Sequence, residues 1–295
     1  MASLALHQHG KSRVRVALHY FVELSVHTVL ESDMAHAFLT PSNEGMTATD
    51  TQKNTVYYIA KQFKSPCTPE AFGIALAKHF VATYPKVSKA KITVEMAPWK
   101  RISLEGQAHE HGFVREGTEV RTAYVTHNKQ GATEVTAGLK DLQASDALAS
   151  RVLKTTQSGY EGFLHDEFTS LPDVKDRIVA TAVSAKWRYT KAPECWDSAY
   201  QGVKAALLEA FYGPPKGGVF SPSVQFTLYQ MAKLAILRVP EVGSVFLNMP
   251  NLHFLPCNPP KSSGFENDVY VATSEPHGTI EAVVTRQAVA PHCRL

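Results

Sequence analysis

The sequence predicts an α+β protein in which antiparallel strands carry helices on one face, with this arrangement built twice in one chain. Two observations favour this class. The chain has 295 residues, which is enough for two units of ~150 residues. Segments that alternate between apolar and polar residues flank pairs of helix-like segments, and the order of strands, two helices and strands occurs in both halves. We place the units at residues 1–140 and 141–295, although the halves share no convincing sequence repeat.

The first half is expected to begin with a β-hairpin. Residues 13–20 alternate apolar with charged or polar side chains, which predicts a strand, and residues 21–29 are expected to pair back onto it. Lys11, Arg13 and Arg15 could form a basic patch. At this charge density we interpret them instead as solvated side chains of the strand.

Two helices follow the hairpin and its polar loop at 41–46. Thr49 and Asp50 are good N-cap residues for the first helix. The second is predicted to begin at Thr68, with Pro69 in its first turn. The apolar stripes of the two helices are Val56, Ile59, Ala60 and Phe63, and Phe72, Leu76, Phe80 and Tyr84.

Strands are then expected near residues 90–96, 112–115 and 119–126, and the polar segment 128–150 is interpreted as the junction between the units. The second half repeats the order. The expected elements are a strand at 177–189, helices at 196–211 and 223–237, and strands near 244–247, 252–255, 268–273 and 279–285.

Charge and hydropathy exclude several classes of protein. The formal net charge is +3, from 30 basic and 27 acidic residues, so electrostatics do not favour nucleic-acid binding. No apolar run approaches the ~20 residues that cross a bilayer, so membrane insertion is not expected. The four cysteines are far apart, which argues against a disulfide framework or a structural zinc site and fits a reducing compartment.

Several common catalytic and cofactor-binding motifs are absent from the sequence. There is no G-x-S-x-G, no G-x-x-x-x-G-K-[ST], no G-x-G-x-x-G and no H-E-x-x-H. His109 and His111 would share one face of a strand, with Glu110 opposite. A catalytic metal needs about three protein ligands, and because no third is evident, we interpret this pair as ordinary strand histidines.

The last three residues, Cys293, Arg294 and Leu295, follow the small, basic, leucine order of the peroxisomal tripeptide whose type is S-K-L. We therefore expect recognition by the peroxisomal import receptor and a location in the peroxisome.

Four phrases together carry a more specific signal. They are ATDTQKNT at 48–55, KTTQSGYEGF at 154–163, SPSVQ at 221–225 and LNMPNLH at 247–253. In order and spacing they resemble the urate oxidase (uricase) family. The resemblance extends over residues 10–295. It implies the tunnelling fold, in which each chain has two α+β halves and four chains form a barrel. It also implies active sites between subunits and no cofactor.

The resemblance assigns urate binding to a set of side chains suited to a flat purine anion. Arg177 would grip a carbonyl oxygen and the adjacent ring nitrogen with its planar fork. Gln225 would bind the opposite edge with its amide, and Val224 would offer its backbone N–H. Thr49 and Asp50 would face the substrate from the neighbouring subunit through the N–H groups of a helix start.

Apolar and aromatic contacts complete this expected binding site. Tyr160 stands where the family usually has a phenylalanine stacked over the purine, and its ring can stack equally well. Leu171 and Ile280 match apolar contacts of the family.

The resemblance places the oxygen chemistry on a second group. Asn251 would hold O2, and later water, above the urate plane together with Thr49. His253 points the same way as Asn251 in an extended segment. It would form a proton relay with Thr49 and Lys11, which come from the neighbouring chain.

Several of these residues also have a structural alternative. Arg177 could pair with Asp176 or Asp173 at the surface. Gln225 could close a capping box, and Thr49 or Asp50 could simply cap a helix. Leu171 and Ile280 could belong to the core, and His253 could be a half-buried strand histidine.

The activity implied by the resemblance is cofactor-free oxidation of urate by O2 and water to 5-hydroxyisourate and H2O2. Two other functions stay open at this point. One is a tunnelling-fold enzyme acting on a pterin or another purine, whose zinc-dependent members need Cys and His ligands. The other is a tetramer that binds purines without turnover.

Overall fold

The computed structural model describes residues 2–140, 152–257 and 269–287, and the chain divides into two compact units. The first consists of Met1–Lys140 with Ala192–Asp197, and the second of Asp141–Lys191 with Ser198–Leu295. Each unit is described by itself. No helix in the described ranges is both long enough and apolar enough to span a membrane.

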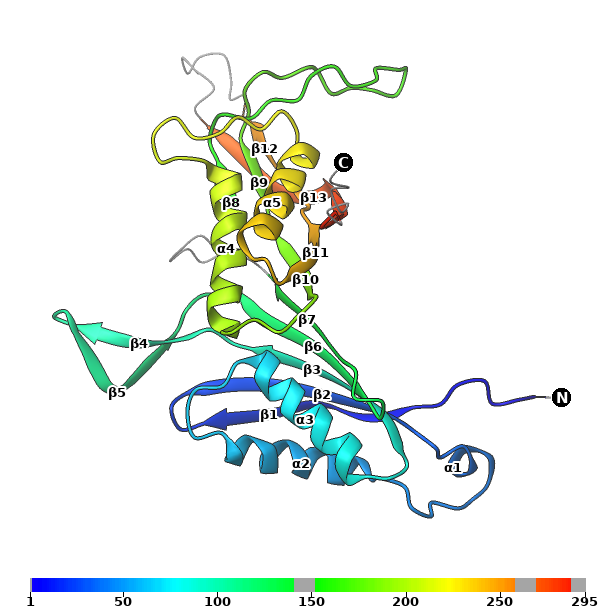
Figure 1. Cartoon of the computed structure of the whole chain (residues 1–295). Coiled ribbons are helices and arrows are strands. Elements are labelled where there is room, and N and C mark those ends of the chain that lie inside the picture. Colours follow the sequence, from blue (N-terminus) through cyan, green and yellow to red (C-terminus); the bar gives the residue numbers. More distant parts are fainter. Residues whose placement is uncertain (1, 141–151, 258–268, 288–295) are drawn as a thin grey trace, which may run out of the picture. The chain divides into compact units, whose positions relative to one another are not determined.

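The first unit contains a sheet of antiparallel strands in the order β1-β2-β3-β6-β7. Helices α2 and α3 lie across one face of this sheet (Figure 1). Strands β4 and β5 pair only with each other, as a separate ribbon. The elements are β1 His9–Leu18, β2 Val22–Ser32, α1 His36–Leu39, α2 Thr49–Gln62, α3 Pro69–Thr83, β3 Val87–Met96, β4 Trp99–Leu104, β5 Gln107–Arg115, β6 Val120–Asn128 and β7 Thr133–Lys140.

The core of the first unit lies between the helices and the sheet. The apolar stripes predicted for α2 and α3 are buried except at their last members, Phe63 and Tyr84, which are the half-buried C-caps. From the sheet, Leu24, Val26 and Leu30 of β2 enter the same core. The side chain of Thr68 caps α3 by accepting a hydrogen bond from the N–H of Ala71 at 3.2 Å, as predicted.

The second unit contains two groups of antiparallel strands, in the orders β10-β11-β14 and β13-β12-β9-β8. Helix α5 packs against β11 and β14. The buried stripe of α4 is the predicted one, namely Ala199, Val203, Leu207 and Phe211. The elements are β8 Val152–Lys154, β9 Val179–Thr181, β10 Ser184–Tyr189, α4 Trp196–Tyr212, α5 Val224–Arg238, β11 Val242–Asn248, β12 Asn251–Pro256, β13 Tyr270–Gly278 and β14 Glu281–Thr285.

Two predictions of secondary structure were wrong. The segment 128–150 is not simply a junction, because β7 occupies Thr133–Lys140 and buries Val135, Ala137 and Leu139. The residues between these apolar side chains are small or carry a hydroxyl, so the alternation of apolar and polar residues that indicates a strand was weak. The single strand predicted at 177–189 is two strands, since the chain leaves the sheet of β9 and enters the sheet of β10 between them. The rest of the predicted junction, residues 141–150, lies outside the described residues.

A β-bulge in β1 overturns the interpretation of Lys11 as a solvated residue of the polar face. Val14 pairs with Val26, but Lys11 pairs with Thr28, so β1 has one more residue than β2 between these pairs. Arg13 within the bulge has φ = 55°. Because directly opposed residues lie on one face of a sheet, the bulge moves Lys11 to the face of Thr28 and Val26, beneath the helices.

Candidate functional site

Lys11 lies near the start of α2. The pKa of the Asp50 carboxyl is below its ordinary value, mainly because Lys53 donates a hydrogen bond to it, and the positive charge of Lys11 also contributes. Lys11 is half-buried, unlike the exposed Arg13 and Arg15. The first unit therefore brings together Lys11, Thr49 and Asp50, which the resemblance assigns to the side of the site supplied by a neighbouring chain.

Neither Thr49 nor Asp50 caps α2, contrary to the structural alternative considered for them. Ala48 is the N-cap residue and no side chain caps this helix. The Asp50 carboxylate instead accepts from Lys53 at 2.6 Å and from the Asn54 amide at 2.9 Å. The N–H groups of the first turn have no partner within a helix, so those of Thr49 and Asp50 are available to an acceptor from outside it.

A buried hydrogen-bonded chain connects α2 with the bulged strand. The Thr28 hydroxyl donates to Gln52 Oε1 at 2.7 Å, and Thr28 Oγ1 accepts from the backbone N–H of Lys11 at 3.3 Å. Thr28 and Gln52 are both fully buried. Thr28 thus couples the position of Lys11 to the first turns of α2.

In the second unit, Arg177 and Tyr160 lie in direct contact. The guanidinium carbon of Arg177 is 5.3 Å from the centroid of the Tyr160 ring. The backbone fixes both residues, since Arg177 N–H donates to Ser158 O at 2.8 Å and Tyr160 exchanges hydrogen bonds with Val174. Tyr160 also contacts Phe163, and the two rings stack with their centroids 4.6 Å apart and their planes 13° apart.

The surface ion pair considered as an alternative for Arg177 is not formed. Asp176 accepts from Thr156 at 2.7 Å, and Asp173 accepts from the N–H of Gly162 at 3.1 Å. The Nε of Arg177 is buried without a hydrogen-bond partner among the described residues, and burial lowers the pKa of its guanidinium. A partly desolvated planar cation that has no carboxylate partner is suited to a planar anion.

Val224 and Gln225 are the first two residues of α5. Ser223 is the N-cap, and its hydroxyl accepts from the N–H of Phe226 at 3.1 Å. The capping box proposed for Gln225 is wrong, because the third helical position is occupied by Phe226. Val224 is buried and Gln225 is exposed, so the Gln225 amide is free to contact a ligand beside the positive end of the helix.

Asn251 and His253 lie together at the start of β12. Both are half-buried, whereas Leu252 between them is buried, so the two polar side chains share one face of the strand. Asn251 pairs with Thr181 of β9, the strand that begins two residues after Arg177. Ile280 is half-buried, and its carbonyl accepts from the N–H of Met249 at 2.8 Å.

Leu171 is not part of the core, because 49% of its surface is exposed. It lies in the loop between Tyr160 and Arg177, where a ligand could cover it. Of the remaining predicted site residues, Cys293, Arg294 and Leu295 lie outside the described residues.

The paired histidines of β5 do not form a metal site within the described ranges. The rings of His109 and His111 contact each other with centroids 4.6 Å apart. Across the part of the chain that the structure describes, no three His, Cys, Asp or Glu side chains are grouped closely enough to hold a metal ion.

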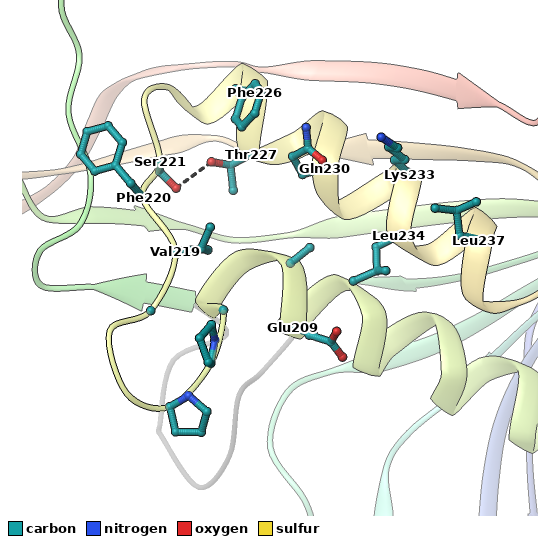
Figure 2. A pocket seen from close by; sticks show the side chains of 15 residues that line it. Glu209, Val219, Phe220, Ser221, Phe226, Thr227, Gln230, Lys233, Leu234 and Leu237 are labelled. Carbon is teal, nitrogen blue, oxygen red and sulfur yellow. Dashed lines mark hydrogen bonds between the residues drawn. The ribbon is translucent and has the colours of Figure 1, made fainter.

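A groove of about 880 Å³ lies between α4, α5 and the loop 213–221, as Figure 2 shows. Its walls are mainly apolar, with Phe226, Leu234 and Leu237 on α5 and Val219 and Phe220 on the loop. None of the predicted urate-binding residues lines it. It is therefore separate from the residues described above, although the loop 219–221 forms one wall.

Comparisons with known proteins agree with the resemblance seen in the sequence. A family model described as Uricase matches residues 7–126 and 147–281. Uricase-2 isozyme 1 of Glycine max is 44% identical over 299 residues, which cover 95% of this chain and 94% of the relative. This chain belongs to the uricase family. The uricase of Danio rerio is 35% identical over 288 residues, covering 95% and 93% of the two chains.

Solved structures support the fold of this uricase-family chain. The crystal structure of uricase from Arthrobacter globiformis matches with a TM-score of 0.86 at 32% identity, covering 99% of this chain and 98% of that chain. The prediction of an α+β tunnelling fold with antiparallel sheets is thus confirmed.

Three residues near the candidate site of this uricase-family chain had no role in the sequence prediction. They are Thr28 and Phe163, described above, and Lys154. Two of them carried a usable signal. Lys154 is a lysine that ends an apolar strand, and Phe163 lies in the same motif as Tyr160. Thr28 had none, because its importance follows from the register of β1 on β2.

Replacing Thr28 by Val tests the buried chain between Lys11 and α2. The change leaves Gln52 Oε1 buried without its donor, so we expect a loss of about 1–3 kcal/mol in the free energy of unfolding. Urea denaturation measures this loss. The control is Thr28→Val combined with Gln52→Leu, which removes both polar partners and should recover most of the stability. A single variant as stable as the unmodified protein would contradict the assignment.

Proposed function

We propose that this chain is a urate oxidase that converts urate, O2 and water into 5-hydroxyisourate and H2O2 without a metal or flavin. The observation that carries the proposal is the Arg177–Tyr160 pair, in a chain of the uricase family. It combines a partly buried cation, which lacks a carboxylate partner among the described residues, with an aromatic ring at 5.3 Å. These are the two groups needed to hold a flat, anionic purine.

Binding of urate in this proposal uses residues of the second unit. The Arg177 fork donates to a carbonyl oxygen and the adjacent ring nitrogen, and the Tyr160 ring stacks on the purine. Gln225 and the N–H of Val224 bind the opposite edge from the start of α5. Leu171 and Ile280 provide apolar contacts, which fits their partial exposure.

Completion of the site in this proposal requires a neighbouring chain. Lys11, Thr49 and Asp50 belong to the first unit, whereas the urate-binding residues belong to the second. A homotetramer would place the first unit of one protomer against the second unit of another, so that the N–H groups of Thr49 and Asp50 meet the five-membered ring.

The proposed chemistry begins with removal of a proton from bound urate through a relay of Lys11, Thr49 and His253. The resulting dianion is electron-rich and passes two electrons to O2 held by Asn251 and Thr49, so a peroxide adduct forms. Hydrogen peroxide leaves, and water adds at the same carbon to give 5-hydroxyisourate. The protein supplies orientation and fixed dipoles, and urate itself is the reductant.

The peroxisome is the proposed location, supported by the sequence Cys293-Arg294-Leu295. The chain with a fluorescent protein fused to its N-terminus should accumulate in peroxisomes, through the import receptor. Leu295→Asp should leave the fusion diffuse, with Val269→Asp, an exposed position elsewhere, as the control. Equal import of all three proteins would contradict the proposal.

The direct test of the activity is aerobic incubation of purified, metal-stripped protein with urate. We expect urate absorbance to fall while peroxide appears in a one-to-one ratio, because each urate delivers two electrons to one O2. Loss of activity on metal removal would contradict the cofactor-free reaction. No turnover with an intact tetramer would favour the pterin or silent-binder functions, and urate binding without turnover would favour the latter.

Substitutions should separate binding from the proton relay. Arg177→Ala should raise the KM for urate by at least ~10-fold, since a charge-assisted bidentate contact is lost. Lys11→Ala should lower kcat by about 100-fold with little change in KM, because general-base catalysis contributes that much. Steady-state kinetics distinguish the two, and Arg15→Ala, an exposed position of β1 outside the bulge, is the matched control. An unchanged KM in Arg177→Ala, or an unchanged kcat in Lys11→Ala, would refute the corresponding role.

A further inference from the structure

Lys154, the last residue of β8, is a buried cation without a carboxylate partner among the described residues. Only 8% of its surface is exposed. Its ammonium donates to Val219 O and to Ser221 Oγ, both at 2.8 Å, and lies 5.3 Å from the centroid of the Phe211 ring. Desolvation lowers the pKa of the Lys154 ammonium to about 8.

Burial of an unpaired ammonium is unfavourable for folding, because its hydration is lost and no anion replaces it. A methionine has a similar length and would fill the same space without that penalty. Stability alone therefore does not account for a lysine here. What the ammonium provides is a pair of charge-assisted hydrogen bonds to one loop segment, Val219–Ser221.

Ser221 connects this loop segment to both parts of the proposed urate site. Toward the helix, its Oγ accepts from the Thr227 hydroxyl of α5 at 2.7 Å, the bond drawn in Figure 2. Toward the other segment, Ser221 N–H donates to Gln157 O, and Gly159 N–H donates to Ser221 O, both at 2.9 Å. Ser221 is itself only 2% exposed.

Each connection ends next to a proposed urate-binding residue. Gly159 precedes Tyr160, and Ser158 accepts from the N–H of Arg177 at 2.8 Å. On the other side, Ser221 is three residues before Val224 at the start of α5. Ser221 is thus connected to Tyr160, Arg177 and the start of α5 through short segments of the chain and hydrogen bonds. Lys154 donates a hydrogen bond to the hydroxyl of Ser221.

The outer side of the loop offers little support of its own. Val219, Phe220 and Ser221 form a wall of the groove between α4 and α5, as Figure 2 shows. Phe220 is 49% exposed. Since a groove of about 880 Å³ lies on that side, the position of the loop depends on the hydrogen bonds made from the inner side.

We propose that Lys154 is a positioning residue for urate binding, which holds Val219 and Ser221 so that Tyr160, Arg177 and the start of α5 keep their mutual spacing. This inference rests on the proposed function, because it concerns the same binding site. Lys154 does not touch the substrate, and it acts through Val219 and Ser221.

Lys154→Met tests the proposal, because it keeps the length of the side chain and removes only the ammonium. We expect the KM for urate to rise about tenfold, the size of one lost charge-assisted hydrogen bond, with kcat changed less than threefold. Urea denaturation should show a stability close to that of the unmodified protein, because removing the buried ammonium offsets the hydrogen bonds that Val219 O and Ser221 Oγ lose. A KM equal to that of the unmodified protein in the folded variant would overturn the proposal.

Two further variants separate positioning from general destabilisation. Val203→Ala creates a cavity in the buried stripe of α4 without touching the loop, so it should lower stability and leave KM unchanged. Ser221→Ala should also raise KM, and the double variant should raise it no further than Lys154→Met alone, because the bond between Lys154 and Ser221 is already lost in that variant. Additive effects, or a KM that follows stability in Val203→Ala, would refute the positioning role.

The proposed function and the role of Lys154 can fail independently. If the unmodified protein binds urate but does not oxidise it, the proposed activity fails. Calorimetric titration of urate into the unmodified protein and Lys154→Met still tests the role of Lys154, where a tenfold weaker affinity supports it and an equal affinity overturns it.

Discussion

The burial of apolar side chains between helices and one face of a sheet is the constraint on which the first unit depends. Strands β1, β2, β3 and β6 supply alternate side chains to that layer, and α2 and α3 supply their apolar stripes. A residue can change face only where the alternation is interrupted. The bulge in β1 is such an interruption, and it places a cation, Lys11, on the face that the helices cover.

Thr28 enters this layer as a polar group whose hydroxyl is held by protein partners rather than by solvent. Thr28 is fully buried and bonds both to Gln52 of α2 and to the backbone of Lys11. Such a network is specific, because each buried donor or acceptor that loses its partner is costly. The same contacts that satisfy the Thr28 hydroxyl therefore also fix the distance between β1 and the start of α2.

Two cations of the second unit, Arg177 and Lys154, lack a carboxylate partner among the described residues, and their surroundings differ. Arg177 keeps a buried Nε without a partner and lies over an aromatic ring, so its capacity for hydrogen bonds is left for a ligand. Lys154 directs its bonds to Val219 and Ser221, so its capacity is used inside the protein. One cation is suited to binding an anion and the other to holding the segments that present the binding groups.

The sequence by itself determined the class of fold, because helical stripes such as Phe72, Leu76 and Phe80 follow from local periodicity. It also indicated the family, because four motifs agree in order. It predicted which residues to consider for the site, including Arg177, Gln225 and His253. Local patterns failed where small or hydroxyl-bearing residues weakened the alternation, as in β7, and where the chain changed sheets between β9 and β10.

Only the tertiary structure decided the face on which Lys11 lies, the absence of a carboxylate beside Arg177 within the described residues, and the connection of Lys154 to the binding segments. The first depends on one extra residue in the pairing of β1 with β2, which alternation along a single strand cannot reveal. The other two depend on contacts between residues distant in sequence, such as Lys154 with Ser221. Such contacts are set by how strands and loops pack, and not by the local preferences of the residues that make them.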